Sequence, residues 1–594
     1  MAEAVLKRRP ASWPQITRYR RDTYNAPSEA LLEHIKDDDS RIGREETQLG
    51  LNRELWTRDL CVVGLILGWG ASLASMATGI YLIAIPAPTI PPWLVKRTAY
   101  VGTTGLSWTS PKDTYINDHQ VYGVSEPAMV IIPLLLQIAI AFVSTCLDSI
   151  HSTTLRWALW NEGRLHHNTN LRLFTCSKIS GPNAWPANIV SSLGLVLMYG
   201  GSTLVTFPVT VTAVIDYSLR GNNPEANPLD FDPDHIGPDK FGISFNGWGL
   251  VGLGVGLFLQ STICTWCLIH DSKQHIVGTW SSTPLATAKA CWCLQTRGSV
   301  KTTLIPSTSD QAVLAKPAPE QPPMRSLVPA ARTITNWVWV IFILHSIFTL
   351  VISLIAAKVQ NSASIDFVRD YTFPDPIDFR SVWKFFGQVS FGYGVNPTSR
   401  MRREWIGLLL QSVAVTILLF GLHLAEVLSG LARDEAMWQR ATKKHGTSPD
   451  SNMIWENARN WPCAVIFVYK ALIPWIFSYA FSCFTYVYMA ILPSLTITLL
   501  YLMLGVFAEY LMRAKPKGPQ PATYGDVRAL IALVDEWDHD PMFWGDKGEH
   551  GHVQGARVAG TGGSPLGDLQ VGVSYTGLSY PHSNRESVTP RDSL

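Results

Sequence analysis

The feature that most constrains this chain is a set of long apolar runs without a charged residue. Leu60–Ile85 contains 26 consecutive residues without Asp, Glu, Lys or Arg, and Pro186–Ile215 contains 30. A helix of about 20 apolar residues crosses the hydrocarbon core of a bilayer. A helix also satisfies its own backbone hydrogen bonds in lipid. The runs therefore predict an integral membrane protein with α-helical spans.

Eight spans are expected in all. Six lie at residues 60–85, 127–147, 186–215, 241–269, 333–357 and 405–428. The run from Trp461 to Met512 is too long for one span, because 52 residues of helix extend about 78 Å. We therefore expect two spans there, joined near Ser482–Tyr488. The long third span is expected to tilt or to bend at Pro208.

A block of sequence occurs twice. Its landmarks in the first copy are Tyr122-Gly123-Val124, Pro127, Leu134-Leu135-Leu136-Gln137 and Trp185-Pro186. They recur in order as Tyr393-Gly394-Val395, Pro397, Leu408-Leu409-Leu410-Gln411 and Trp461-Pro462, at separations of 271, 270, 274 and 276 residues. Such self-similarity indicates a duplicated unit. The expected fold is all-α: a polytopic transmembrane helical bundle of about eight spans, arranged as two parallel four-span repeats.

The expected organisation has five parts: a cytosolic N-terminal arm at 1–59, a first four-span repeat at 60–270, a flexible cytosolic Pro/Ser-rich linker at 271–332, a second four-span repeat at 333–512, and a cytosolic tail at 513–594. In the tail, one amphipathic helix is expected from the apolar stripe of Val527, Leu530, Ile531, Val534 and Trp537, followed by disorder.

Positive charges set the expected orientation. The loops assigned to the cytosol (151–185, 270–332 and 429–460) hold sixteen Lys and Arg residues, whereas the outer loops 86–126 and 216–240 hold five. This distribution follows the positive-inside bias. The outer loop 358–404 departs from it with seven, but the repeat requires its placement outside. Both termini are expected in the cytosol, and the plasma membrane is preferred to an internal membrane.

Ionisable side chains inside the expected spans are candidate functional residues, because a charge is costly in hydrocarbon. Lys470 is the clearest of them, and Glu426 and Asp148 are its expected partners near the cytosolic end. Such a neutralised pair would suit a site on a transport path. The structural alternative is an ion pair without a further role, or a lysine that reaches to the interface.

His345 and His423 are weaker candidates for the same path, because a single histidine in a span is usually a hydrogen-bonded packing residue. Gln137 and Gln411 occupy the same position in the two copies of the repeated block. We expect the two glutamines to pair with each other across a pseudo-two-fold axis and so to join helices.

The segment Ile150–Phe174 combines Leu and Trp at helical spacing with basic residues between them. This pattern predicts an amphipathic helix lying on the cytosolic membrane surface. The functional alternative is recognition of a lipid or substrate at the interface by its polar residues, namely Arg156, Arg164, His166, His167 and Arg172.

Signatures of chemistry are sparse. The sequence contains no H-E-x-x-H motif, nucleophile elbow or Walker loop, so no catalytic residue and no cofactor is predicted. Cys264-x-x-Cys267 and Cys291-x-Cys293 have spacings seen in zinc sites, but no compact fold is expected around them, and no metal is predicted. A net charge of +2 gives no reason to expect a nucleic-acid partner.

The stretches Ser152–Trp160, Glu162–Leu165 and Asn168–Leu173, with Val534–Trp537 and Phe543–Lys547 in the tail, resemble segments of an uncharacterised family of multi-pass membrane proteins of filamentous fungi. The resemblance implies a fungal source and a membrane location. It carries no activity.

By analogy with other duplicated carriers, the leading functional prediction is a transporter or channel-like protein with a path for a small solute or ion between the halves. The alternative is a membrane scaffold or sensor that acts through cytosolic segments, with a protein partner at the tail. An unrecognised membrane enzyme is the least favoured alternative. The lipid bilayer is the one partner expected in every case.

Overall fold

The computed structural model describes residues 55–84, 121–169, 175–211, 240–296, 316–360, 388–392, 400–449, 456–457, 459–483, 486–549 and 557–578. Contacts divide the chain into residues 1–52 and 53–594, and all described residues belong to the second unit. The expected N-terminal arm therefore lies almost entirely outside the described residues.

Among the described residues, eight helices are long and apolar enough to cross a membrane. They are α2 (Leu55–Ala84), α3 (Glu126–Asn161), α4 (Trp185–Leu204), α5 (Gly247–Gln274), α8 (Pro329–Gln360), α10 (Arg400–Trp438), α12 (Trp461–Ala480) and α13 (Ile491–Arg513). The expectation of a mainly helical, multi-pass membrane protein is confirmed at this level. α4 and α12 are each 20 residues long, and each begins at a Trp-Pro pair. Proline fits the first helical turn because it lacks the backbone N–H donor that would be unsatisfied there.

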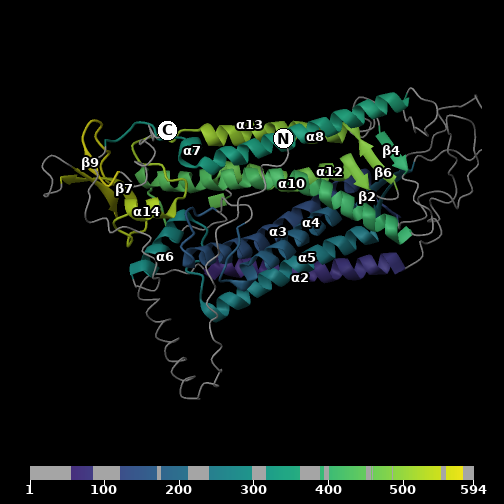
Figure 1. The fold of residues 1–594 in the computed structure, drawn as a ribbon, viewed down its shortest axis with the longest axis horizontal. Coiled ribbons are helices and arrows are strands. Elements are labelled where there is room, and N and C mark those ends of the chain that lie inside the picture. Colours follow the sequence, from purple (N-terminus) through teal and green to yellow (C-terminus); the bar gives the residue numbers. More distant parts are fainter. Residues whose placement is uncertain are drawn as a thin grey trace, which may run out of the picture. The chain divides into compact units, whose positions relative to one another are not determined.

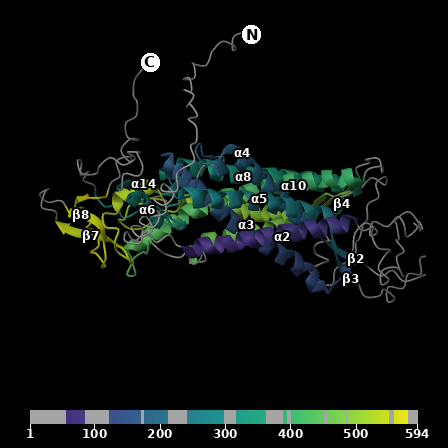
Figure 2. The same ribbon diagram turned by 90° about the horizontal axis from the view of Figure 1, so that it is seen from below.

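Two small antiparallel sheets lie at the same end of the eight helices, which we call the sheet end (Figures 1 and 2). The first contains β1 (Val121–Gly123), β2 (Thr206–Val211) and β3 (Lys240–Phe245) in the order β1-β3-β2. The second contains β4 (Gln388–Gly392), β5 (Phe481–Cys483) and β6 (Tyr486–Ala490) in the order β4-β6-β5. Both halves of the chain therefore have the same order of elements: helix, strand, helix, helix, strand, strand, helix.

These strands settle two expected boundaries. The break within 461–512 is confirmed, because β5 and β6 pair between α12 and α13. The expected tilt or bend of a long third span at Pro208 is wrong: α4 ends at Leu204, and Pro208 lies in β2 opposite Ile243. Proline cannot continue a helix, and its β-branched neighbours favour an extended chain.

Within the first half, α5 packs on α2 and α4, and within the second half α13 packs on α8 and α12. The halves meet where α4 contacts α10 and where α3 contacts α12. The halves also meet where α5 lies against α10. The small Gly252 of α5 permits close approach, since a Cβ added to it would lie 3.0 Å from the Leu408 side chain of α10. Beside it, the rings of Trp248 and Trp405 are 4.7 Å apart.

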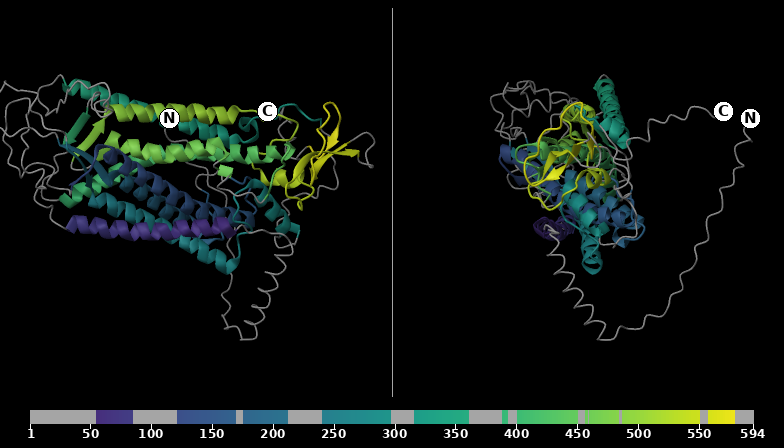
Figure 3. Two further views of the ribbon diagram at one scale, coloured as in Figure 1. Left: turned by 180° about the vertical axis from the view of Figure 1, so that it is seen from behind. Right: turned by 90° about the vertical axis from the view of Figure 1, so that its left-hand side faces the viewer.

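The opposite end of the helices, which we call the domain end, carries a folded domain (Figure 3). It comprises the helices α6 (Pro284–Thr296), α7 (Met324–Leu327) and α14 (Val527–Leu533), the 3₁₀ turns η3 (Gly181–Asn183) and η7 (Gln439–Thr442), and a sheet of β7 (Phe543–Glu549), β8 (Arg557–Gly562) and β9 (Tyr575–Thr576). Trp438 and Tyr575 are fully buried in it. Segments from both halves of the chain build this domain.

The domain corrects three expectations. Residues 150–161 continue α3 and bury Trp157 and Trp160 at 0% and 2% exposure, so they do not form a helix on the membrane surface. The expected flexible linker contains α6 and α7, packed on α14 and α13 respectively; its residues 297–315 lie outside the described residues. α14 covers Val527–Leu533, the first part of the expected tail helix, and after it β7–β9 form a sheet within 543–549 and 557–578, where disorder was expected. Apolar residues of these segments are buried only against one another, which the sequence alone does not reveal.

Exposed aromatic side chains mark both boundaries of the membrane-crossing region. At the domain end they are Trp56, Trp185, Trp337, Trp461 and Tyr510, all 49–65% exposed. At the sheet end they include Tyr81 and Trp405, at 60% and 40%. Tryptophan and tyrosine concentrate at headgroup depth because one part of each ring is apolar and one part is polar. Trp56 and Tyr81 of α2 are separated by about 37 Å of helix, which fits a hydrocarbon core with its interfaces.

Candidate functional site

An ion pair joins two of the membrane-crossing helices. Lys470 is the tenth of the 20 residues of α12, and its Nζ lies 2.6 Å from Oε1 of Glu426 on α10. The lysine side chain is 14% exposed and the glutamate side chain 33%. Lys470 and Glu426 are therefore brought together as expected. Glu426 follows Trp405 of the sheet end by 21 residues, about 32 Å of helix, so the pair lies closer to the domain end. Burial costs each ion its hydration, and the close contact offsets part of this cost.

His423 extends the pair along α10. Its Nδ1 lies 3.5 Å from the second carboxylate oxygen of Glu426, three residues further along the helix. The carboxylate of Glu426 thus lies between a lysine and an imidazole. A cluster with one fixed cation and one titratable ring can hold or release a proton at Nδ1 or Nε2 of His423.

The other half of the chain contributes Asp148 on α3 and Tyr199 on α4. Asp148 is exposed and interacts electrostatically with both His423 and Lys470. The Tyr199 hydroxyl lies 3.1 Å from Ser144 Oγ and within electrostatic range of Lys470. The structure therefore groups Asp148, Glu426, His423 and Lys470 around the contact between the halves. We call these four residues the charged cluster.

The exposed part of the charged cluster lies beside the lipid-facing residues of α10. On α10 the strongly exposed apolar residues are Leu409, Val413 and Ile417, at 53%, 57% and 49%. At about 100° per residue, His423 lies about 80° and Glu426 about 140° around the helix from Val413. Trp405, which is 40% exposed, lies at the same angle as His423. The His423 and Glu426 side chains are 52% and 33% exposed, so both ionisable groups are accessible at the edge of this exposed side.

Gln137 and Gln411 bind the sheet-end termini of helices. Gln137 donates to the Ser202 carbonyl near the end of α4, at 3.1 Å. Gln411 donates to the Phe481 carbonyl that follows α12, at 3.0 Å, and to Thr203 Oγ1 of the other half, at 3.1 Å. The last carbonyls of a helix have no partner within it, so each glutamine satisfies one. Gln411 joins the halves through Thr203, whereas the bond of Gln137 to Ser202 lies within its own half. A pair between the two glutamines stays a prediction.

His345 does not belong to the charged cluster. It is 8% exposed on α8, with Nε2 3.3 Å from the Ser494 carbonyl of α13 and its ring 6.4 Å from that of Tyr501. This is the environment of a hydrogen-bonded packing residue between two helices of the same half.

Of the residues proposed for recognition at the interface, Arg156 is buried in the domain, Arg164 and His167 are half-buried, and His166 is exposed. Arg156 is 8% exposed and donates to the Ser281 carbonyl at 3.2 Å and to Thr287 Oγ1 at 3.3 Å. Arg164 donates to Glu162 at 2.6 Å and to the Cys176 carbonyl at 3.0 Å. These contacts hold chain segments together, so a recognition role for the two arginines is not favoured by their surroundings.

The two histidines of this segment lie against α14. The His166 carbonyl accepts from the Val527 amide at 3.0 Å, and His167 pairs with Asp526 through a β-bridge. Burial lowers the pKa of His167 below its ordinary value, against the raising effect of Asp526 and Asp434. Arg172 lies outside the described residues.

The sequence did not identify a buried acidic pair at the start of the domain. Asp434 is fully buried and accepts hydrogen bonds from Asn168 at 3.0 Å, Thr169 at 3.1 Å and Arg433 at 2.9 Å. Glu435 accepts from the backbone amides of Thr523 and Tyr524, both at 2.8 Å. The pair therefore joins loops of the two halves to the tail. In the sequence it resembles ordinary solvated charge, because its partners are distant along the chain.

Within the described ranges, no group of three or more His, Cys, Asp or Glu residues is placed to hold a metal ion. Cys264 and Cys267 are buried in α5, and Cys264 Sγ lies 3.3 Å from the Leu147 carbonyl of α3. Comparison with protein-family models, with curated proteins and with solved structures finds no match to this chain.

Proposed function

We propose that this membrane protein transports a small ionic solute or an ion along the contact between its two halves. The observation that carries the proposal is the charged cluster within the membrane-crossing helices, in which Asp148 of one half lies in electrostatic range of His423 and Lys470 of the other. Ionisable groups within spans are costly and are retained mainly where they serve a path or a proton relay. Their partly exposed side chains give a solute access to both signs of charge.

The proposal includes an internal repeat of four spans with both copies in the same orientation. It is supported by the repeated sequence landmarks, by the shared order of elements and by the matching strand orders of the two sheets. The contacts between halves support it further. Exchange of the copies converts the α4–α10 contact into the α12–α3 contact, and both occur. A pseudo-two-fold axis between the halves places the charged cluster where carriers built from repeats bind their substrates.

The proposed orientation places the domain end in the cytosol. With the domain end in the cytosol, the segments rich in Lys and Arg (151–185, 270–332 and 429–460) lie on the side that the positive-inside bias favours. Both termini are then cytosolic. The plasma membrane is the proposed location.

The test is an uptake screen. Cells that lack the protein and cells that overproduce it are compared for accumulation of a panel of radiolabelled ions and small charged metabolites. For any solute that responds, Lys470→Met should reduce the flux per folded molecule in the membrane at least tenfold. Lys443→Met is the matched control, because Lys443 is an exposed cation of the domain end. Full flux in Lys470→Met with intact folding would refute the transport site.

The alternative function is a membrane scaffold or sensor. The observation that favours it is the folded domain, in which α6, α14 and β7–β9 present a structured surface outside the membrane. A scaffold would keep its cellular role in Lys470→Met and lose it when residues 514–578 are removed. A transporter would show the opposite dependence on Lys470.

A further inference from the structure

Six exposed basic side chains gather where α8 and α13 leave the membrane-crossing region at the domain end. Backbone bonds fix this arrangement: the Gln321 amide donates to the Pro516 carbonyl at 2.9 Å, and the Gly518 amide donates to the Pro319 carbonyl at 3.0 Å. The short helix α7 packs on both α8 and α13. The group, which we call the basic surface, consists of Lys316, Arg325, Arg332, Arg513, Lys515 and Lys517.

The basic surface carries an uncompensated positive charge. Glu320 pairs with Lys515 at 3.2 Å, and Glu509 pairs with Arg513. Among the described residues, no ion pair involves the other four cations. Elsewhere in the domain Arg440, Lys547 and Arg557 each pair with a carboxylate at 2.6–2.7 Å. Repulsion between neighbouring cations is unfavourable for folding, so their concentration on one surface indicates an anionic partner.

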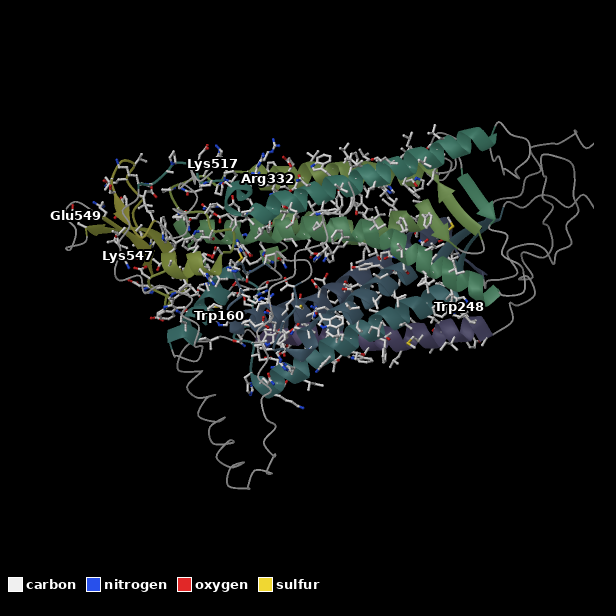
Figure 4. All side chains as sticks on the ribbon, in the orientation of Figure 1. Trp160, Trp248, Arg332, Lys517, Lys547 and Glu549 are labelled. Carbon is white, nitrogen blue, oxygen red and sulfur yellow. The ribbon has the colours of Figure 1, made fainter. Side chains whose placement is uncertain are left out.

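The exposed aromatic side chains at the domain end indicate the depth of the basic surface in the membrane. Trp337 of α8 and Tyr510 of α13 are 49% and 58% exposed. Arg332 precedes Trp337 by five residues, which is about 7 Å of helix, and Arg513 follows Tyr510 by three, about 5 Å. The cations therefore lie just outside the level at which tryptophan and tyrosine meet the headgroups. Figure 4 shows Arg332 and Lys517 on the same edge of the helices, beside the ends of α8 and α13.

We propose that the basic surface binds the headgroups of anionic phospholipids in the leaflet that faces the domain end, with a polyphosphorylated headgroup favoured. Phosphate oxygens at headgroup depth are the anions nearest to these side chains. Arginine pairs with phosphate through two parallel hydrogen bonds, whereas lysine acts as a point charge. Clusters of four to eight cations immediately beside membrane helices bind such lipids. The proposal is independent of transport, since it uses none of the charged cluster.

The test uses purified full-length protein in phosphatidylcholine nanodiscs that contain a small fraction of phosphatidylinositol bisphosphate. Native mass spectrometry counts bound lipid, and titration with a fluorescent short-chain form of the same lipid gives the affinity. The variant Arg332→Gln/Lys517→Gln removes two cations of the basic surface without leaving a carboxylate unpaired. Each lost cation should weaken binding about fivefold, and both together on the order of 25-fold.

The matched control is Lys443→Gln/Lys444→Gln. These exposed cations follow η7, where the neighbouring Thr447 pairs with Met542 of the tail. The control should change the affinity less than twofold. Equal weakening in both variants, or no weakening in the first, would overturn the proposal.

Two further measurements on the unmodified protein apply if the first variant unfolds. Binding should fall steeply with added salt, and the soluble inositol phosphate headgroup should compete far less effectively than the lipid. Salt-independent binding would contradict the proposal. Equal competition by the soluble headgroup would assign the surface to a free phosphate compound instead of a membrane lipid.

Discussion

Separating the Lys470–Glu426 ion pair should destabilise the protein strongly, whereas replacing both residues should not. With an effective dielectric constant of about 20, unit charges at the observed 2.6 Å separation attract by about 6 kcal/mol. Lost hydration of the two ions offsets most of this attraction. A Lys470→Met variant leaves the Glu426 carboxylate within the membrane-crossing region with His423 as its remaining close partner, 3.5 Å away.

The size of the expected loss in unfolding free energy follows from the burial of the ion pair. Removing one member of a buried pair costs about 3–5 kcal/mol. Because the Glu426 side chain is 33% exposed, we expect the lower end, about 3 kcal/mol, for Lys470→Met. The double variant Lys470→Met/Glu426→Leu should unfold within about 1 kcal/mol of the original protein, since apolar replacements of buried pairs are commonly neutral or stabilising. Glu426→Leu should cost at least as much as Lys470→Met, because it leaves the more deeply buried Lys470 unpaired, so the coupling energy is about 5 kcal/mol.

The assay is a double-mutant cycle in lipid bicelles, with unfolding by a denaturing detergent followed by tryptophan fluorescence. The control cycle uses Lys515→Met and Glu320→Leu. That pair is 3.2 Å apart with side chains 58% and 55% exposed, so its coupling should lie below about 1 kcal/mol. A coupling between positions 470 and 426 no larger than that of the control pair would show that the membrane pair is not formed.

Three further predictions follow from the contacts described above. Gln137→Leu and Gln411→Leu should each lower the free energy of unfolding by about 1–3 kcal/mol, because each leaves a buried helix-terminal carbonyl unsatisfied; chemical unfolding measures this, and an unchanged free energy in both would contradict the role of the glutamines. Burial raises the pKa of Glu162, but hydrogen bonds from Ser177, Arg164 and the Lys178 and Ile179 amides outweigh it, so the pKa lies below its ordinary value. The stabilisation by Glu162 is therefore present above the unfolded pKa of about 4.3 and is lost as the pH falls through the lower folded pKa. Glu162→Gln should be less stable than the original protein at neutral pH, and this difference in unfolding free energy should shrink in acid. A difference that does not depend on pH would contradict the hydrogen bonds assigned to Glu162. Epitope tags inserted beside Pro127 and Pro397 should be accessible from the same face of intact cells, and access from opposite faces would exclude parallel repeats.

Much of the membrane-crossing region could be predicted from the sequence. Spans are recognisable because lipid excludes charge and requires about 20 apolar residues per crossing. The Trp-Pro pairs marked the first turns of α4 and α12 for a local reason, the missing donor of proline. The prediction that the third span continues to a bend at Pro208 was wrong for a non-local reason. An apolar run of constant hydropathy does not distinguish the last turns of α4 from β2, whose pairing with β3 depends on a distant segment.

The charged cluster was partly predictable. Lys470 and Glu426 stood out because each interrupts an apolar run, and opposite charges in lipid require partners. The sequence showed that His423 lies three residues before Glu426, but not that its ring approaches the Glu426 carboxylate. Helical spacing alone cannot decide which face of α10 meets lipid and which meets α12 and α4.

The sequence by itself determined that this chain crosses a membrane as apolar helices and that its landmarks recur, because hydrocarbon thickness and backbone hydrogen bonding act locally on each segment. Only the tertiary structure decided whether the polar segments between the helices are buried or exposed. Trp157, Arg156, α6 and α14 are buried because residues from both halves cover them. Asp434 is a buried acceptor instead of a surface charge for the same reason. Burial of a polar group depends on partners hundreds of residues away, and no local pattern encodes them.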